Sequence, residues 1–455
     1  MEYTIDQQQA LENMLKWYKT LTVKSAKSLL YLLDGAAGTG KTTVAKEIIN
    51  ILGLRKGQLA VTAPTHQAKK VIQAATDIQA ITTQKLLGLR PNTDLADFDI
   101  ARPQFDPLGE DMIKYYKVIL IDEGSMLNKD AFDMLEEKAI RYGVRIIFMG
   151  DSYQLPPVNE KTGKIFTAVE SKSRLLTVIR QGIDNPNTDL LLGIRADIDA
   201  GNSNNFNNFM AGGTITMGDK GYHPQNNVEF GKNLMKYLNS TVYEHDINYV
   251  RYLAWRNISV EKWCIGLRNA ILKEKSSEFI IEGEKLIGYT TISDYRSGEI
   301  YLQNSDNYTV VHIEDDESRE GIQGKTITIR DDEGVENRHF IVTPNSYEMF
   351  KQVAYEKWTD ATSATFNTRG KMWGIYYTFK NNHLLLTDLR YRGMNITKDL
   401  YYASGSTVHK SQGSTFTNTA INVKDIMRNP TTSERLRLLY VAASRCRETN
   451  LLLVK

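Results

Sequence analysis

Eight consecutive residues near the start of the chain have the spacing of a phosphate-binding loop. They begin at Gly35 and read G-A-A-G-T-G-K-T, which fits the pattern G-x-x-x-x-G-K-[ST]. An apolar run, 28–34, precedes them, and a run with helical periodicity, 42–52, follows. Glycines let backbone N–H groups converge on phosphate oxygens, and the start of a helix adds partial positive charge. The alternative is a glycine-rich turn with a solvated lysine, which the flanking strand and helix patterns disfavour.

The residues of this loop are expected to bind a nucleoside triphosphate. Lys41 is placed to reach the β- and γ-phosphates, and the hydroxyl of Thr42 is suited to ligate Mg²⁺. The predicted nucleotide-binding residues of the loop are Gly35, Ala36, Ala37, Gly38, Thr39, Gly40, Lys41, Thr42 and Thr43.

A second apolar run, 117–123, ends in two carboxylates about eighty residues after the loop. Asp122 is predicted to hold Mg²⁺ through its water shell. Glu123 is predicted to orient and deprotonate the attacking water, because hydrolysis needs a base in line with the γ-phosphate. A strand followed by two acids is common, so the pair alone is weak evidence. Its position about eighty residues after a phosphate-binding loop is what indicates a role in hydrolysis. Together the two motifs predict nucleotide hydrolysis but not its purpose.

Two segments that follow strand-like runs carry further polar groups. In GDSYQLPPV (150–158), Gln154 is an uncharged donor that is predicted to sense the γ-phosphate. In APTHQAKK (63–70), polar side chains at a helix start are predicted to face a nucleic-acid backbone phosphate. The alternatives are a capped strand turn for the first segment and a solvated helix start for the second.

Two segments near the C-terminus carry polar and cationic groups suited to nucleic-acid contact and to nucleotide hydrolysis. STVHKSQGSTF (406–416) combines hydroxyl, cationic and amide groups suited to sugar and phosphate contact. YVAASRCRETN (440–450) places Arg445 and Arg447 on a predicted helix, from which Arg445 is positioned to act as an arginine finger.

The elements that position these residues alternate between strand and helix in the first half of the chain. Strand-like runs at 59–64, 117–123 and 144–151 are separated by helical stretches such as 129–143. Strands that alternate with helices favour a parallel sheet covered on both faces. The proline-containing, acidic segment 88–111 breaks this rhythm, and its interpretations are an insertion or a long surface loop.

The second half of the chain resumes the same rhythm with an interruption. A strand is predicted at 249–255 and a helix at 257–272, whereas the Asn-rich stretch 201–213 is predicted to be loop. Between about 284 and 400, alternating apolar and polar residues indicate antiparallel strands. After Tyr402 the α/β pattern returns. We therefore expect two α/β domains, the second interrupted by a β-rich insertion.

In chain order these motifs resemble those of the superfamily 1 helicases. The resemblance is to the 5′-to-3′ branch (superfamily 1B) that contains the Pif1 and RecD proteins, and within it to the phage Dda-like helicases. The most specific segments are HKSQG (409–413) and GD-x-x-QLPPV (150–158). The remaining segments that match are T-x-x-Q (4–7), GAAGTGKTT (35–43), APTHQAKK (63–70), ITTQKLLGL (81–89), DEGSM (122–126), LTVIRQ (176–181) and YVAASR (440–445). One departure is Thr83-Gln84, where relatives usually have Thr-His.

The resemblance implies an α/β fold with two RecA-like P-loop motor domains. The first motor domain is expected at 1–184, with a pin-like hairpin insertion at 88–111. The second is expected at 185–286 and 402–455, and a β-rich SH3-like domain at 287–401. Either Phe98 or Phe105 of the insertion is expected to separate the strands of a duplex.

The resemblance also assigns roles to residues outside the phosphate loop. ATP, with Mg²⁺, is expected between the motor domains, where Gln7 reads the adenine edge and Gly413 contributes to the nucleotide site. Arg180 and Arg445 are expected to contact the γ-phosphate from the side of the nucleotide opposite Lys41, Thr42 and Asp122. The expected DNA-binding residues are Pro64, Thr65, His66, Lys69, Thr83, Gln84, Phe98, Thr407, His409, Lys410 and Ser411.

The predicted function is an ATP-dependent DNA helicase that moves 5′-to-3′ on single-stranded DNA and opens forked duplex DNA. A translocase that displaces bound proteins has the same motifs and stays open as an alternative. A P-loop kinase would not need the later motifs, and a non-enzymatic binding module would need a broken phosphate site. The motifs leave partners such as single-strand-binding or replication proteins open, and monomeric action is expected.

Composition narrows the class of protein without identifying it. The 455 residues include 56 Lys and Arg against 54 Asp and Glu, so a net charge of +2 neither supports nor excludes nucleic acid. Two cysteines, Cys264 and Cys446, cannot form a disulfide framework. An N-terminal stretch without an apolar core is not expected to be a signal peptide, and no apolar run is long enough to cross a membrane. The expected location is therefore the cytoplasm, that of a bacterial host if a phage encodes the protein.

Overall fold

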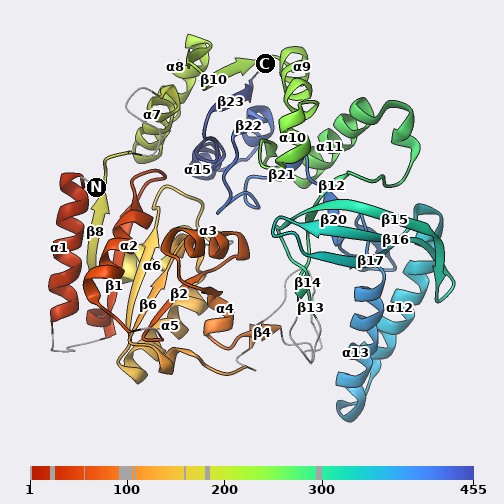
Figure 1. Ribbon diagram of the computed structural model, residues 1–455, viewed down its shortest axis with the longest axis horizontal. Coiled ribbons are helices and arrows are strands. Elements are labelled where there is room, and N and C mark those ends of the chain that lie inside the picture. Colours follow the sequence, from red (N-terminus) through yellow and green to blue (C-terminus); the bar gives the residue numbers. More distant parts are fainter. Residues whose placement is uncertain are drawn as a thin grey trace. The chain divides into compact units, whose positions relative to one another are not determined.

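The structure, a computed structural model, describes residues 3–20, 26–55, 57–91, 105–106, 109–157, 160–179, 185–293 and 300–454. The chain divides into two compact units, each built from more than one stretch of sequence (Figure 1). The first comprises Met1–Leu89, Pro107–Glu261 and Ser406–Lys455, and the second comprises Arg90–Asp106 and Lys262–Gly405. The first unit contains two separate, mostly parallel sheets, whereas the second unit is built on an antiparallel sheet.

The first sheet of the first unit is parallel throughout. Its strands, in spatial order, are β3 (Ala80–Thr82), β2 (Leu59–Ala63), β6 (Val118–Ile121), β7 (Arg145–Gly150), β1 (Leu30–Gly35) and β8 (Ser171–Leu175). The principal helices that cover it are α1 (Ile5–Lys19), α2 (Lys41–Leu52), α3 (His66–Thr76) and α5 (Lys129–Tyr142), with α4 (Thr83–Leu86) and α6 (Lys164–Ala168) beside them. The predicted parallel sheet is thus confirmed.

Strand β6 shows why the functional carboxylates stand where they do. Its side chains alternate between the faces, so that Ile119 and Ile121 pack against α5 while Val118 and Leu120 pack with α1, α2 and α3. Because helices cover both faces, all four residues of β6 are apolar and buried. Polar residues therefore begin only at the carboxyl end of the strand, with Asp122.

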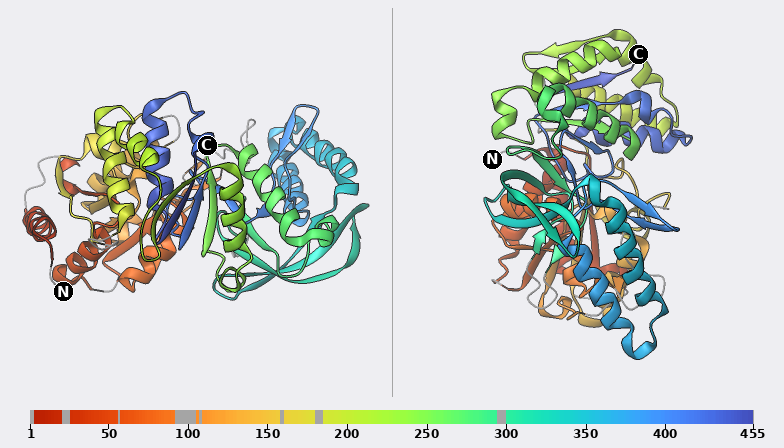
Figure 2. Two further views of the ribbon diagram at one scale, coloured as in Figure 1. Left: turned by 90° about the horizontal axis from the view of Figure 1, so that it is seen from above. Right: turned by 90° about the vertical axis from the view of Figure 1, so that its right-hand side faces the viewer.

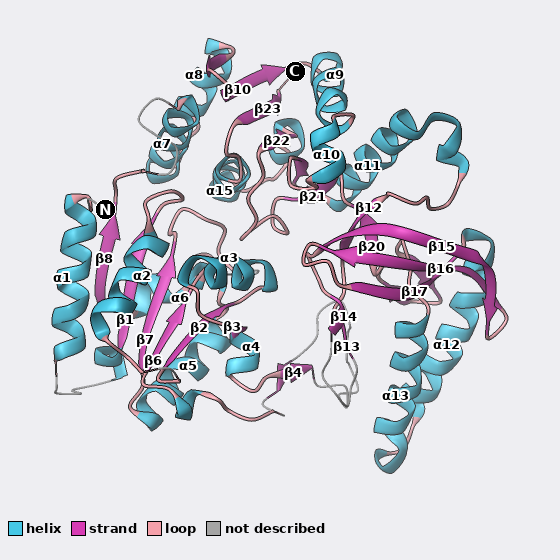
Figure 3. Cartoon of the chain, in the orientation of Figure 1, coloured by secondary structure: helices cyan, strands magenta, loops and turns pink. Residues whose placement is uncertain are grey.

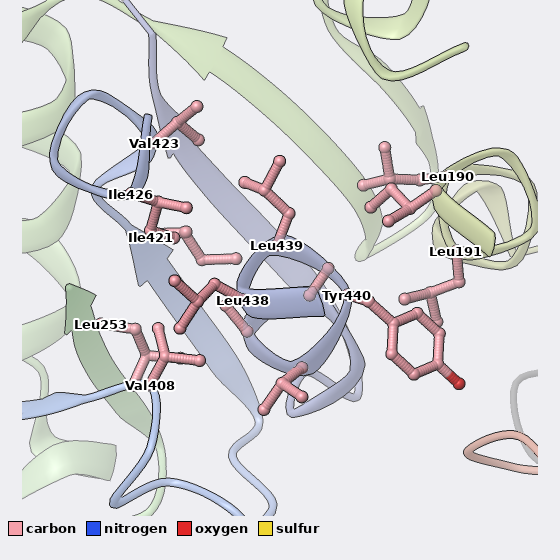
Figure 4. Packing of buried hydrophobic residues seen from close by; sticks show 14 of the residues in the cluster. Leu190, Leu191, Leu253, Val408, Ile421, Val423, Ile426, Leu438, Leu439 and Tyr440 are labelled. Atoms are coloured by element: carbon pink, nitrogen blue, oxygen red, sulfur yellow. The ribbon is translucent and has the colours of Figure 1, made fainter. Parts of the chain in front are cut away.

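The second sheet of the first unit is assembled from distant parts of the chain. Its strands, in spatial order, are β21 (Gly405–Thr407), β11 (Val250–Ala254), β22 (Asn418–Ile421), β23 (Thr449–Leu453), β10 (Lys220–Gln225) and β9 (Ile215–Met217). The pairings of β11, β22, β23 and β10 are parallel, and β9 is antiparallel to β10. Helices α7 (Pro186–Ala200), α9 (Asn227–Leu238) and α15 (Thr432–Ser444) pack beside these strands, and apolar residues such as Leu190, Ile421 and Leu438 form one buried cluster (Figure 4).

One loop prediction in this region is wrong. Residues Asn204–Gly212 form helix α8 rather than loop. The buried carboxylate of Asp197, at the end of α7, accepts hydrogen bonds from the backbone N–H groups of Asn205 and Phe206. Phe206 is buried in the same apolar cluster as α7. Tertiary contacts therefore stabilise a helix that its Asn-rich sequence does not favour.

The second unit contains a five-stranded antiparallel sheet. Its strands, in spatial order, are β17 (Glu336–Val342), β16 (Ile322–Asp331), β15 (Asn307–Arg319), β12 (Lys285–Gly288) and β20 (Leu400–Tyr402). The antiparallel strands expected between 284 and 400 are confirmed. The sequence patterns did not indicate two long helices in the same region, α12 (Tyr347–Ser363) and α13 (Phe366–Asn382) (Figure 3). The rings of Phe350 and Phe379 stack between these helices with centroids 5.4 Å apart, and the helices lie side by side in further views (Figure 2).

The predicted pin insertion falls mostly outside the described residues. Within it, Arg90–Pro91 (β4) and Phe105–Asp106 (β5) pair in antiparallel fashion. Phe98 lies outside the described part of the chain. The roles of Phe98 and Phe105 in strand separation, and the SH3-like character of 287–401, stay predictions.

Candidate nucleotide-binding and DNA-binding sites

The phosphate loop joins β1 to α2, as its sequence predicts. Gly38 and Gly40 both have φ of +80°, and Gly40 is the N-cap of α2. A Cβ atom at Gly40 would lie 2.4 Å from Nε2 of Gln7. Glycine is therefore required at position 40 for two reasons: its backbone is in the left-handed region, and the Gln7 side chain leaves no room for a Cβ atom.

The side chain of Lys41 lies within the loop. Its Nζ donates to the carbonyl oxygens of Gly35 at 2.6 Å and Ala36 at 3.2 Å. The hydroxyl of Thr39 donates to the same Ala36 oxygen at 2.9 Å. These contacts hold the ammonium group at the mouth of a loop whose N–H groups are suited to phosphate oxygens.

Asp122 is almost fully buried at the carboxyl end of β6. Burial and the neighbouring Glu123 carboxylate raise the pKa of Asp122 to about 7, although the charge of Lys41 opposes that shift. A carboxylate with this pKa is one that a nearby cation would stabilise in its ionised form. The residues present thus fit Mg²⁺, because this ion binds through one or two carboxylates and substrate phosphates rather than through a cage of protein ligands. Thr42, in the first turn of α2, supplies the hydroxyl.

Within the described ranges, no group of three or more acidic, histidine or cysteine side chains gathers around a possible metal position. A site formed by Asp122, Thr42 and the phosphates of a bound nucleotide does not require such a group.

Glu123 occupies an unusual backbone conformation. Its φ of +48° lies in the left-handed region, which is uncommon for a residue other than glycine. The N–H of Glu123 donates to Oδ1 of Asp122 at 2.9 Å, and a short 3₁₀ turn, Gly124–Met126, follows. This turn carries the chain away from the strand and leaves the Glu123 side chain half-buried beside Asp122. Backbone strain of this kind is concentrated at functional sites.

Gln154 is buried in the loop after β7, and its Oε1 has no hydrogen-bond partner within the described part of the chain. The backbone of the loop is well held, because the N–H of Gln154 donates to the carbonyl of Asp151 at 3.1 Å. Nη1 of Arg437, on α15, donates to the carbonyl of Gln154 at 2.8 Å. A buried unpaired acceptor costs free energy, which is characteristic of a group kept for a ligand or water.

Gln7 is buried against the phosphate loop. Its Nε2 donates to the carbonyl of Thr39 at 3.1 Å, and its Oε1 accepts from the N–H of Thr4, completing a capping box at the start of α1. Sequence reasoning placed Gln7 at the adenine edge. The structure brings it to the loop itself, and its contact with adenine stays a prediction.

Arg445 is buried in the second α/β domain. Its guanidinium donates to the carbonyls of Val441 and Ser414, both at 3.2 Å, and to the hydroxyl of Ser444. Its action on a γ-phosphate stays a prediction. The other proposed arginine, Arg180, lies outside the described residues, although the N–H of Ile179 donates to the carbonyl of Gly38 at 2.8 Å.

Two segments predicted to bind DNA lie next to one another. Thr65 is the N-cap of α3, and its hydroxyl accepts from the N–H of Ala68 at 3.2 Å. A Cβ atom at Gly413, in the later motif, would lie 3.6 Å from Oγ1 of Thr65 and 3.4 Å from the Cβ of Ala68. Gly413 thus lies against the start of α3, and its predicted contribution to the nucleotide site stays a prediction.

The predicted DNA-binding side chains differ in their exposure. Pro64, His66, Lys69, His409 and Lys410 are half-buried. Burial and the charges of Lys69, Lys70 and Lys85 lower the pKa of His66 to about 4. Burial also lowers the pKa of His409.

Three of the other predicted residues use their hydroxyl groups inside the protein. The Thr83 hydroxyl lies 3.0 Å from that of Thr62, the Ser411 hydroxyl donates to the carbonyl of Val408, and the Thr407 hydroxyl accepts from the N–H of Lys410. All three side chains are buried. Oε1 of Gln84 is buried without a hydrogen-bond partner among the described residues.

Sequence reasoning missed two polar residues of the site. Gln412 is buried, and its Nε2 lacks a hydrogen-bond partner in the described part of the chain. Its position between Ser411 and Gly413 in a matched motif was a usable signal. Tyr440 is buried, and its hydroxyl contacts Asp151 and the backbone N–H of Ala37. Its position at the start of the matched segment YVAASR was also a usable signal.

Comparisons with known proteins agree with this fold. A family model for an AAA domain matches residues 5–220, and one for a UvrD-like helicase C-terminal domain matches residues 402–453. The ATP-dependent DNA helicase RRM3 of Saccharomyces cerevisiae is 30% identical over 198 residues, which cover 38% of this chain and 26% of RRM3. The ATP-dependent DNA helicase dda of Enterobacteria phage T4 is 32% identical over 127 residues, which cover 28% of each protein.

The solved structure of Bacteroides Pif1 bound to single-stranded DNA aligns with 99% of this chain and 92% of its own, with a TM-score of 0.52 and 18% identity. The fold is thus that of a P-loop protein with α/β domains, similar to the fold of Pif1. The family matches and the helicases among the relatives support an enzyme of the DNA helicase and ATPase class. The curated helicases are matched over less than a third of their own length, and a special closeness to dda stays a prediction.

Proposed function

We propose that this protein is an ATP-dependent DNA helicase that moves 5′-to-3′ along single-stranded DNA and separates the duplex ahead of it. The observation that carries the proposal is the direct connection between the nucleotide site and the second α/β domain. Arg437 of α15 donates to the carbonyls of Ser152 and Gln154, in the loop beside the phosphate-binding residues. A motor needs such a connection, because hydrolysis must change how two domains are held together.

The residues of the first domain divide the work of hydrolysis. Lys41 and the loop N–H groups hold the phosphates, Glu123 orients and deprotonates the attacking water, and Gln154 contacts the γ-phosphate or that water. Asp122 and Thr42 would hold Mg²⁺, which would supply charge neutralisation at the phosphates when bound. Arg445 completes the site from the second domain when the two domains close on ATP.

The DNA-binding surface is the adjacent pair of segments at the start of α3 and at 407–413. His66, Lys69, His409 and Lys410 offer groups for phosphate and sugar. Gln84 and Gln412 offer amide atoms that have no hydrogen-bond partner among the residues that the structure describes. Contacts of this kind carry little sequence information, so we propose binding without strong sequence preference. We propose that the protein acts as a monomer on forked DNA and that its protein partners are single-strand-binding or replication proteins.

Strand separation on tailed duplexes tests the function. Matched duplexes that carry either a 5′ or a 3′ single-stranded tail are mixed with the protein, ATP and Mg²⁺, and Lys41→Ala serves as the inactive control. Unwinding of only the 5′-tailed duplex is expected. Preference for the 3′ tail would contradict the polarity, and DNA-stimulated ATP hydrolysis without unwinding of either duplex would favour a translocase that displaces bound proteins.

A further inference from the structure

A single buried hydroxyl group connects three functional segments of the first unit. The hydroxyl of Tyr440, on α15, donates to Oδ2 of Asp151 at 2.8 Å and accepts from the backbone N–H of Ala37 at 3.2 Å. Tyr440 is 1% exposed, and its hydroxyl points away from the apolar cluster around Leu438 and Leu439 (Figure 4). The hydroxyl thus joins the arginine-bearing helix, the Gln154 loop and the phosphate loop.

Neighbouring residues hold both Asp151 and Tyr440 in position for their hydrogen bond. Asp151 is 1% exposed, and its Oδ1 accepts from the N–H of Tyr153 at 3.0 Å, so the carboxylate is fixed to face Tyr440. The ring of Tyr153 lies beside that of Tyr440, with centroids 6.0 Å apart. Burial and the Asp151 charge raise the pKa of Tyr440 well above its usual value, so the hydroxyl keeps its proton and remains a donor to the carboxylate.

Helix α15 connects Tyr440 to the Gln154 loop, through Arg437, and to Arg445. Arg437 lies three residues earlier on the same helix and holds the backbone of the Gln154 loop. Arg445 lies at the end of the helix, where its guanidinium is fixed to Val441. Because a helix of this length moves as a unit, a change in the Tyr440 contact shifts both arginines together.

The partner of Tyr440 in the phosphate loop is a backbone N–H group, that of Ala37. The N–H groups of such a loop cradle phosphate oxygens, and Ala37 contributes an N–H to this loop. One N–H cannot make a full hydrogen bond to a phosphate and to a tyrosine hydroxyl at once.

We propose that Tyr440 is a positioning residue that couples the phosphate loop to the second motor domain. This proposal rests on the proposed function. A phosphate in the loop takes the Ala37 N–H from the Tyr440 hydroxyl, and this exchange frees α15 to carry Arg445 and the Gln154 loop into their catalytic positions. When the phosphate leaves, the Tyr440 contact returns and resets the domains.

The test compares Tyr440→Phe with Tyr252→Phe in the full-length chain. Tyr252 is a matched control, because it is also fully buried in the second domain and its hydroxyl accepts from Nδ2 of Asn422 at 2.7 Å, away from the phosphate loop. Affinity for fluorescent mant-ADP with Mg²⁺ is measured without DNA. Removing the competing hydroxyl should tighten mant-ADP binding by roughly three- to tenfold, as expected for one hydrogen bond, whereas Tyr252→Phe should leave it unchanged.

Steady-state ATP hydrolysis supplies a second readout. Tyr440→Phe should lower DNA-stimulated kcat about tenfold or more without raising the KM for ATP, because closure is no longer linked to the loop. A merely structural role would weaken nucleotide binding and lower the melting temperature together. Asp151→Asn, which loosens the hydroxyl from the other side, should change affinity in the same direction by a smaller factor.

Unchanged or weaker mant-ADP binding in both Tyr440→Phe and Asp151→Asn would overturn the role of Tyr440. The failure of the proposed function is separate, because it would appear as absent DNA-stimulated hydrolysis in the unmodified protein. The mant-ADP comparison needs no DNA and remains valid in that case.

Discussion

The side-chain amide of Gln7 donates to the backbone carbonyl of Thr39 at 3.1 Å, which ties the first helix of the chain to the phosphate loop. Asp6, its neighbour, accepts from the N–H groups of Leu176 and Thr177 at 2.7 and 2.9 Å. The segment that leads to Arg180 is thereby held next to the loop. Helix α1 is therefore bonded directly to the phosphate loop and to the segment 176–177.

We expect Gln7→Ala to raise the KM for ATP by about tenfold, because loss of a buried hydrogen bond loosens the loop, while kcat changes less. The measurement is steady-state hydrolysis with saturating single-stranded DNA. Gln8→Ala, whose exposed amide donates to the carbonyl of Tyr3, is the matched control. If Gln7 also reads adenine, the variant should lose discrimination between ATP and UTP, and preserved discrimination would rule out that second role.

Substitution by alanine should affect nucleotide binding differently at the two glycines that cap α2, Gly40 and Gly53. Gly40→Ala places a Cβ atom 2.4 Å from Nε2 of Gln7 at a φ of +80°, so we expect mant-ADP binding to be lost. Gly53→Ala, at the other end of the helix with a φ of +56°, has nothing within 4 Å of the new atom. It carries only the backbone cost of about 1 to 3 kcal/mol and should bind nucleotide normally. Equal binding by both variants would contradict this account of the loop.

Lys41→Ala and Arg445→Ala should separate nucleotide chemistry from DNA binding. We expect Lys41→Ala to reduce turnover by roughly 10²-fold or more while affinity for an oligonucleotide stays within about twofold. Arg445→Ala should retain mant-ADP binding and lose turnover on the order of 10³-fold. Arg447→Ala is its control on the same segment. Turnover near that of the unmodified protein in Arg445→Ala would contradict the arginine-finger assignment.

Neighbouring residues of α4 should differ in their effect on DNA binding. Thr83→Val removes a hydroxyl that pairs with Thr62 inside the protein, so we expect a lower melting temperature with little change in oligonucleotide affinity. Gln84→Ala removes an amide whose Oε1 has no hydrogen-bond partner in the described part of the chain, so it should weaken oligonucleotide binding severalfold without lowering the melting temperature. Fluorescence anisotropy and thermal melting provide the two readouts, and a reversed pattern would show that Thr83 is the DNA contact.

The lowered pKa of His66 predicts how the stability of the protein changes with pH. Its pKa of about 4 in the folded chain lies below the ordinary value of 6.5. Between these values the unfolded chain binds a proton that the folded chain does not, so the contribution of His66 is complete above pH 6.5 and is lost as the pH falls towards 4. We expect His66→Gln to show a smaller drop in melting temperature between pH 7.5 and 5 than the unmodified chain. Equal drops would show that His66 does not titrate in this range.

Local patterns determined the phosphate loop, because its glycines, lysine and flanking elements are contiguous in the chain. The same holds for β6 and Asp122, since a strand buried on both faces must be apolar until it ends. Periodicity also indicated β11, β15, β16 and β17. It did not indicate α8, because the contacts of Asp197 and Phe206 that stabilise this helix depend on its packing against α7.

What only the tertiary structure decided is which groups meet. Thr83 and Gln84 are adjacent in sequence, yet the Thr83 hydroxyl pairs with that of Thr62, whereas Oε1 of Gln84 has no hydrogen-bond partner within the described ranges. Ala37 and Tyr440 are separated by 403 positions, and no pattern within either segment marks the other as its partner. The sequence determines which chemical groups exist and which local elements carry them. Their hydrogen bonds across the chain depend on how those elements pack, because a buried polar group takes the partner that the packed domains place within reach.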